Sequence, residues 1–382
     1  MVISSLLIYV GTAALLMLLG LVAQKHDSAL PVQQQRFLCS TNVLAVLIFA
    51  CVAGARWHTG YDHDLYLNYL FSQAQLGFSP RESFEPGFAL ITKAFAYSGV
   101  HFFFYFAFWA ALQIGLLYYA LRKHKFLLPW LALCLMLGPY FLHWMNSIRQ
   151  VVIECLFVAT WQWVADKKFW RFLLITLLAM TIHKVAIVML PLYFVVQIKV
   201  KGNERIIAYT LLAMCIVAGC FPQWAKWLLQ ASGDLLGQFG YHYHALSDRT
   251  LQGFRTLTWG PNRLAALALV AIIIWLYPQV KQHFKGDRLL VISFRLGLIY
   301  ACYNHLMANT TVFLLRPGEV MMGFMLVMTA YTLCYLYKSR RWLWLAALLV
   351  LACSFVPIEL YKVAKMPSLS SLPVLYQPFF VN

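Results

Sequence analysis

The chain has 382 residues, of which 62% are hydrophobic and only 11% are charged. A soluble globular protein carries about 25% Asp, Glu, Lys and Arg, so this composition excludes a soluble enzyme. The formal net charge of +17 comes from Lys and Arg in short clusters between apolar runs. Such clusters fix membrane topology, and they argue against a nucleic-acid-binding protein.

Apolar runs of roughly 17 to 25 residues recur along the chain, and each can cross a hydrocarbon core of about 30 Å. They predict membrane helices near residues 2–23, 37–55, 101–121, 126–142, 148–165, 205–222, 263–279, 289–308, 312–337 and 342–360. Two stretches do not fit this series. We expect 85–98 to form a re-entrant or interfacial helix, and 171–198 to form two short helices that meet at a polar tip. The fold class is therefore all-α, a polytopic transmembrane helical bundle with about 10 to 12 spanning helices.

A single integral membrane domain is expected over residues 1–382, with large loops at 56–84 and 223–262. Of the 30 Lys and Arg residues, seventeen fall on one side of these helices, twelve on the other, and Arg295 within a helix. The side with the excess is predicted to be cytoplasmic. Both large loops and both termini then face outward. The nine cysteines form no CxxC pair, so we expect neither a metal site nor a disulfide framework.

The segment 56–69 concentrates polar and aromatic residues just outside a predicted helix. It holds one arginine, two carboxylates, two histidines and four large aromatic residues. Aromatic faces stack on sugar rings, Asp, Asn and His bind hydroxyls, and Gly60 allows a tight turn. We therefore expect sugar binding here, with an interfacial aromatic belt as the alternative.

Glu85 opens the short apolar stretch 85–98 and is followed by Pro86 and Gly87. An acid just before a proline is what a helix N-terminus prefers, so a helix cap would explain Glu85. The sharper interpretation is a re-entrant helix that carries Glu85 into a cavity from the outer face. Irregular backbone at membrane depth is tolerated only where protein or water lines it.

Asn146, Arg149 and Gln150 lie between two apolar runs. We expect all three to fall on one face of the following helix, which would aim Arg149 at a target. Glu154 lies further along the same predicted helix. It is either a functional group or the buried partner of Arg149 or another cation.

Polar residues also interrupt later apolar runs. His183 and Lys184 are costly at their position unless they face a cavity or a partner. Arg316 and Glu319 open the run 312–337, where an intrahelical ion pair would explain them. The cationic positions expected at this same outer face are Arg56, Arg149, His183 or Lys184, and Arg316. An anion is their simplest common target, because guanidinium groups match phosphate oxygens bidentately.

These segments together resemble the EpsG family of Wzy-type bacterial polysaccharide polymerases. The resemblance rests on Arg56 with Gly60-Tyr61-Asp62 and Tyr66, Glu85-Pro-Gly-Phe88, Asn146-Ser-Ile-Arg-Gln150, His183 and, more weakly, Arg316. It is clearest from the second predicted helix to the His183 region, and beyond that it is mostly hydropathy plus Arg316.

The resemblance implies a glycosyltransferase of the GT-C-like, lipid-linked type in the bacterial inner (cytoplasmic) membrane. It would polymerise undecaprenyl-diphosphate-linked oligosaccharide repeat units at the periplasmic face, without a cofactor. The candidate catalytic residues, in falling order as the base, are Glu85, Asp62 and His183. The candidate substrate-binding residues are Arg56, Tyr61, Tyr66, Asn146, Arg149, Gln150, Lys184, Arg316 and Glu319. The implied partners are the lipid-linked oligosaccharide and membrane lipid, and a chain-length regulator protein is compatible with them.

Two other classes of protein stay open. A transporter or flippase for lipid-linked sugars also needs a basic cavity, but it usually shows paired repeats, and the sequence has no such symmetry. An O-antigen ligase-like transferase or a membrane acyltransferase would use similar residues with a different acceptor. The sequence also leaves open whether the product is capsule, exopolysaccharide or O-antigen.

Overall fold

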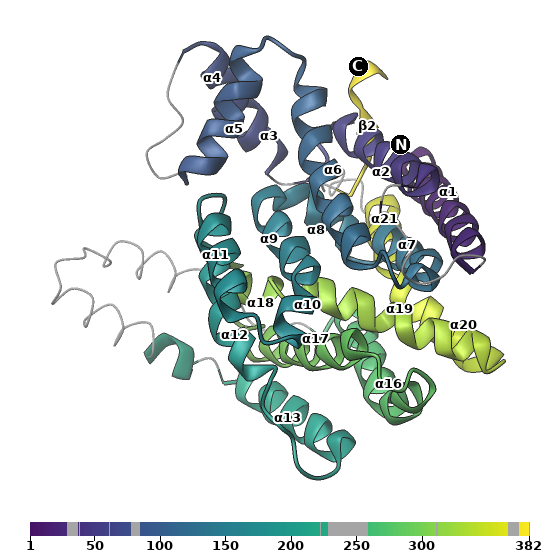
Figure 1. The fold of residues 1–382 in the computed structure, drawn as a ribbon. Coiled ribbons are helices and arrows are strands. Elements are labelled where there is room, and N and C mark those ends of the chain that lie inside the picture. Colours follow the sequence, from purple (N-terminus) through teal and green to yellow (C-terminus); the bar gives the residue numbers. More distant parts are fainter. Residues whose placement is uncertain are drawn as a thin grey trace, which may run out of the picture.

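The computed structural model describes residues 1–28, 37, 39–60, 62–77, 85–221, 223–227, 259–310, 312–365 and 374–381 (Figure 1). The N-terminal half contains α1 (Val2–Ser28), α2 (Ser40–Gly54), β1 (Arg56–Trp57), α3 (His63–Tyr66), η2 (Leu67–Phe71), α4 (Ser72–Gln75), α5 (Pro86–Tyr97), α6 (Phe102–Ala120), η3 (Lys125–Leu127), α7 (Leu128–Leu137), α8 (Tyr140–Asn146), α9 (Ile148–Ala159) and α10 (Trp161–Ala165). The remainder contains α11 (Phe169–Met180), η4 (Lys184–Val188), α12 (Met189–Val195), α13 (Glu204–Gly219), α16 (Pro261–His283), α17 (Arg288–Leu306), α18 (Val312–Glu319), α19 (Met322–Lys338), α20 (Trp342–Cys353), α21 (Phe355–Lys365), β2 (Gln377–Pro378) and η6 (Phe379–Val381).

The predicted all-α, polytopic membrane fold is confirmed. Among the described residues, four helices are long and apolar enough to cross a membrane, namely α1, α6, α16 and α17. The count rises to six if each of two bent pairs is one span: η3 and α7 with α8, bent by 65°, and α20 with α21, bent by 53°. The structure thus gives fewer full-length spans than the ten to twelve expected. Several apolar runs are divided, for example near Pro139 and at Thr160, and hydropathy does not register such breaks.

The centre of the molecule is α19, in which every residue from Met322 to Leu336 is buried. A helix that is hydrophobic all round belongs in the core of a large helical protein. A second, smaller core contains aromatic residues of η2, α5 and α6, and it packs against the start of α9. This second core supports the segments that carry the outer-face motifs.

The stretch 171–198 confirms the prediction of two short helices that meet at a polar tip. α11 ends at Met180, and η4 begins at Lys184 and continues into α12. The rings of Phe172 and Tyr193 lie 5.0 Å apart, which shows that the chain doubles back on itself. The tip between α11 and η4 contains His183.

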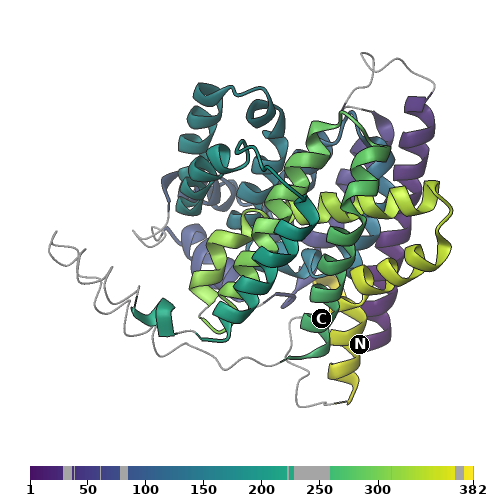
Figure 2. The same cartoon turned by 90° about the horizontal axis from the view of Figure 1, so that it is seen from below.

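The N-terminal helix and the C-terminal segment meet at one end of the molecule (Figure 2). The Tyr9 hydroxyl donates to the Val374 carbonyl at 2.8 Å, and the Tyr376 N–H donates to Ser5 Oγ at 2.9 Å. β2 pairs antiparallel with β1, so Arg56 lies opposite Pro378. The C-terminal segment therefore fixes the start of the polar segment 56–69.

Candidate active site

The N-terminus of α5 is docked on the tip between α11 and η4. Pro86 occupies the first turn, where its missing N–H costs nothing. The N–H groups of Gly87 and Phe88 both donate to the carbonyl of Thr181, at 2.8 and 3.2 Å. A Cβ at Gly87 would lie 2.5 Å from Thr181 Oγ1, so only glycine allows this close approach. The Pro-Gly pair after Glu85 thus brings two distant segments together.

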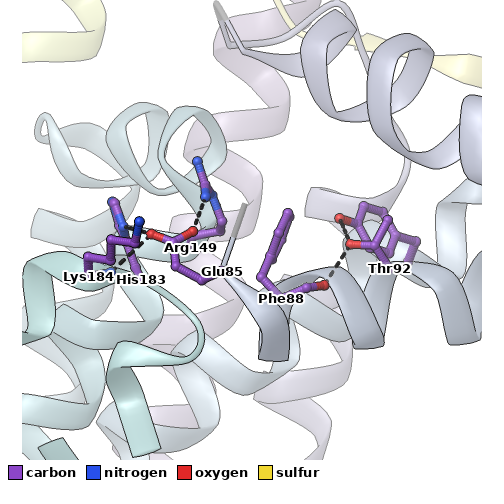
Figure 3. Close-up of polar contacts among 7 residues, drawn as sticks. Glu85, Phe88, Thr92, Arg149, His183 and Lys184 are labelled. Carbon is purple, nitrogen blue, oxygen red and sulfur yellow. Dashed lines mark hydrogen bonds and ion pairs between the residues drawn. The ribbon is translucent and has the colours of Figure 1, made fainter. Parts of the chain in front are cut away.

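Glu85 accepts hydrogen bonds from two other segments, α9 and the tip between α11 and η4 (Figure 3). Arg149 Nη1 lies 2.6 Å from Glu85 Oε2. On the other oxygen, His183 Nδ1 lies at 2.9 Å and the backbone N–H of Lys184 donates at 3.0 Å. The carboxylate is 5% exposed, so these contacts replace nearly all of its water. Glu85, Arg149 and His183 therefore form one cluster, as their shared outer face predicted.

The ionisation of Glu85 follows from these contacts. Burial of the carboxyl group raises its pKa. The hydrogen bonds from His183 and the Lys184 N–H, together with the Arg149 charge, outweigh burial and lower the pKa to about 2. Glu85 is therefore an anion at neutral pH, and its two oxygens are already engaged.

Arg149 lies in the first turn of α9, where Ser147 separates that helix from α8. Its guanidinium also lies over the Phe88 ring, 4.9 Å from the centroid. This cation–π contact and the Glu85 pair hold the side chain in one orientation. Asn146 ends α8, so it does not share a helix with Arg149 as the sequence predicted.

Asp62 and Tyr66 lie beside the same cluster. The Asp62 N–H donates to Asn146 Oδ1 at 2.9 Å, which ties the polar segment 56–69 to the end of α8. Burial raises the pKa of the Asp62 carboxyl, and the charges of Arg316 and Arg149 act against that rise. Asp62 is thus close enough to interact electrostatically with both arginines. Tyr66 is buried, with its ring against Phe88.

Gln150 connects α9 to α18. Its side-chain N–H groups donate to the Arg316 carbonyl and to Glu319 Oε2, each at 2.7 Å. Among the described residues, neither Arg316 nor Glu319 makes an ion pair, so the intrahelical pair considered for them is not formed. The Arg316 side chain is partly exposed. An unneutralised arginine thus lies near Asp62.

Arg56 lies outside this cluster. It is 1% exposed, and its guanidinium donates to the carbonyls of Ala53 and Met145 at 2.7 and 3.2 Å. It also lies over the Phe106 ring, 4.3 Å from the centroid. These contacts join α2, α6 and α8. Tyr61, the other predicted sugar-binding residue of this segment, lies outside the described residues.

A histidine and carboxylate group that the cysteine pattern did not indicate lies at β1 and α3. Ligand atoms of His58, His63 and Asp64 lie within 4.8 Å of one another, close enough to hold a metal ion. Burial and the Arg56 charge lower the pKa of His63 to about 4, so its imidazole is neutral. Direct contacts without a metal explain the same distances, because Asp64 Oδ1 lies 2.8 Å from His58 Nδ1 and 3.4 Å from His63 Nδ1.

His143 is a polar residue that the sequence reasoning missed. Its Nε2 lies 3.6 Å from Glu154 Oε2, and Trp144 Nε1 donates to the other Glu154 oxygen at 3.3 Å. Glu154 is thus partnered by His143 and not by Arg149. A histidine directly after the apolar run 126–142 was the signal that could have indicated this pair.

A family model for EpsG matches residues 41–374, which include every residue of the Glu85 cluster. The chain matches no curated protein and no solved structure. EpsG is a Wzy-like polysaccharide polymerase family. The chain belongs to the EpsG family.

Proposed function

We propose that the protein polymerises polyprenyl-diphosphate-linked oligosaccharide repeat units, with its active site at the periplasmic face of the bacterial inner membrane. One observation carries this proposal. Glu85, Arg149 and His183 come from three distant segments and meet in one buried cluster, with Asp62 and Arg316 nearby. A lipid diphosphate places its charged group at the membrane surface, where Arg149 and Arg316 can reach it.

Arg149 and Arg316 bind the diphosphate in this proposal. A guanidinium has five N–H donors, and the Glu85 carboxylate takes one of those on Arg149. The Arg316 guanidinium forms no ion pair within the described ranges. When the bond from the anomeric carbon to the diphosphate oxygen breaks, negative charge develops on that oxygen. Preorganised cations stabilise the departing diphosphate and lower the barrier.

His183 is the better candidate for the general base, ahead of Glu85. A carboxylate with a pKa of about 2 is a weak base at neutral pH, and both Glu85 oxygens already accept hydrogen bonds. His183 uses Nδ1 for Glu85, and within the described part of the chain Nε2 has no hydrogen-bond partner. Glu85 then orients the imidazole, as a carboxylate does for the histidine of a catalytic triad.

The reaction consists of one substitution. Nε2 of His183 takes the proton of the acceptor hydroxyl, and the acceptor oxygen forms a bond to the anomeric carbon of the donor. The bond from that carbon to the diphosphate breaks, and polyprenyl diphosphate leaves with the electron pair. Asp62 is the alternative base, because burial raises its pKa toward the range in which carboxylates accept protons.

The test is polymerisation by the purified protein. Incubation with polyprenyl-diphosphate-linked repeat units should give a ladder of longer glycans and release polyprenyl diphosphate. His183→Ala should abolish the ladder, and His283→Ala, at an exposed histidine at the end of α16, serves as the matched control. A protein that only moves the intact substrate across vesicles would be a flippase, and the proposal would be wrong.

Deletion of the gene gives an independent test in cells. Loss of a polymerase should leave surface glycan of single repeat units, whereas loss of a flippase should leave none. A gel of the surface glycan distinguishes the two.

A further inference from the structure

A cavity of about 310 Å³ adjoins the Glu85 cluster, and none of Glu85, Arg149 and His183 lines it. It is lined by residues of α8, α17, α18 and α21. Two of its lining residues also belong to the cluster's surroundings: Asn146, which holds the Asp62 N–H, and Glu319, which accepts from Gln150. The cavity therefore begins where the proposed diphosphate site ends.

The lining combines aromatic and polar groups. Tyr300, Tyr303 and Phe355 supply rings, while Asn146, Asn304 and His143 supply hydrogen-bonding groups. Leu142, Leu315, Met322 and Val374 supply an apolar remainder, and the polar groups distinguish this lining from the purely apolar one that suits a lipid tail. Ring faces with a few convergent polar groups are what a sugar ring requires.

The charges in the lining are of one sign. Two carboxylates, Glu319 and Glu359, line the cavity, and no Lys or Arg does so among the described residues. Lys362 lies 2.6 Å from Glu359 and neutralises it. The hydrogen-bond partner of Glu319 is the neutral amide of Gln150, and in the described ranges it makes no ion pair. His143 also lines the cavity and interacts electrostatically with Glu319, so Glu319 is the lining carboxylate that has no Lys or Arg partner in the described ranges.

We infer that this cavity binds the donor sugar attached to the diphosphate, and that it accepts neutral or amino sugars and rejects uronic acids. The inference rests on the proposed function. Arg316 and Glu319 lie three residues apart on α18, about 4.5 Å along the helix axis. That spacing matches a phosphate at Arg316 and its directly linked sugar at Glu319. The carboxylate accepts sugar hydroxyls or pairs with an ammonium group, but it repels another carboxylate.

Binding of short-chain citronellyl-diphosphate sugars to the purified full-length protein tests the inference. The probes carry either glucose or glucuronic acid and differ only in the carboxylate. We expect the glucuronic acid probe to bind at least about tenfold more weakly. Glu319→Gln should reduce that ratio to about twofold, because glutamine keeps the shape of the side chain and loses its charge. Equal binding of the two probes to the unaltered protein would overturn the inference.

Two further variants keep the test informative. Asn304→Asp adds a third carboxylate to the lining and should widen the ratio. Glu204→Gln is the matched control, because Glu204 pairs with Lys281 at 2.7 Å and does not line the cavity. It should leave the ratio unchanged. The role of Glu319 would be contradicted if Glu319→Gln and Asn304→Asp left the ratio of the two binding affinities unchanged, as the control Glu204→Gln does.

Sugar-free citronellyl diphosphate separates this inference from the proposed function. Suppose that this probe binds, that Arg316→Ala weakens its binding, and that the glucose and glucuronic acid probes bind equally. The diphosphate site is then supported, and the assignment of the cavity fails. If the probe does not bind, the proposed function fails. The cavity is then judged by methyl glucoside and methyl glucuronide alone, which should still differ in the same direction.

Discussion

The Glu85 carboxylate and the Arg149 guanidinium lie 2.6 Å apart, although 64 residues separate them in the chain. The pair is nearly buried, and it connects the start of α5 to the first turn of α9. When one partner of a buried ion pair is removed, the loss of folding stability usually exceeds the stability that the intact pair contributed. The remaining charge is then buried without a partner. Here His183 and the Lys184 N–H still hold Glu85 when Arg149 is replaced. Stability and activity can therefore be separated at Arg149.

Arg149→Ala should abolish polymer formation with only a small fall in the apparent melting temperature. Arg149→Lys should also fail, since a point charge does not reproduce the planar guanidinium. Glycan ladders and thermal unfolding of the purified protein give the two measurements. Arg171→Ala, at an exposed arginine of α11, is the matched control and should behave like the unaltered protein. Full-length glycan from the lysine variant would argue against bidentate phosphate binding.

Arg56→Ala, in contrast to Arg149→Ala, should mainly lower the stability of the protein. The guanidinium is buried and donates to two backbone carbonyls, so its loss leaves a cavity and two unsatisfied acceptors. We expect a destabilisation of about 2 to 5 kcal/mol. Thermal unfolding should show a larger fall for Arg56→Ala than for Arg149→Ala. Normal stability with complete loss of binding to citronellyl diphosphate would instead make Arg56 a substrate ligand.

Gly87→Ala should disturb the cluster without changing any charge. An added Cβ would lie 2.5 Å from Thr181 Oγ1 and 2.9 Å from the Thr181 carbonyl oxygen, so α5 must move away from the tip. Because Glu85 directly precedes this turn, its distance to His183 should increase. We expect at least about a tenfold loss of polymerisation rate. Gly115→Ala, where no atom lies within 4 Å of the added Cβ, is the control.

Asp62→Asn should stabilise the protein at neutral pH. Burial raises the pKa of Asp62, so the folded protein prefers the protonated form and ionisation destabilises it. That penalty is present above the folded-state pKa and disappears as the pH falls below the unfolded value. The gain in melting temperature should therefore be larger at pH 7 than at pH 4. An equal gain at both pH values would mean that charge is not the cause.

The orientation of the chain can be tested with single cysteines in a background without native cysteines. Tyr69 is the exposed last residue of the polar segment 56–69, and Lys123 is exposed just after the C-terminal end of α6. Tyr69→Cys should react with a membrane-impermeant thiol reagent added from the periplasmic side, and Lys123→Cys should not. Equal labelling of both would place the two ends of α6 on the same side and contradict the predicted topology.

The sequence predicted which segments meet at the site better than it predicted their contacts. Hydropathy located the helices and the polar tip, and a shared face brought together Glu85, Arg149 and His183. The sequence did not show that both oxygens of Glu85 accept hydrogen bonds, because those contacts depend on where the fold places Arg149 and His183. The burial of Arg56 was missed for the same reason. Its partners Met145 and Phe106 are far away in the chain, and only the folded structure places them around the guanidinium.

The pairing of β1 with β2 also sets an order of events during biosynthesis. Thr59 donates to the Leu375 carbonyl across 316 residues, so the polar segment cannot reach its final position until residues near 375 have been made. At about 5 to 20 residues per second, synthesis of the intervening chain takes roughly 15 to 60 seconds. During that time the first helices are already in the membrane while segment 56–69 lacks its partner strand. The nascent protein therefore acquires a finished site only after the residues near 375 have been made.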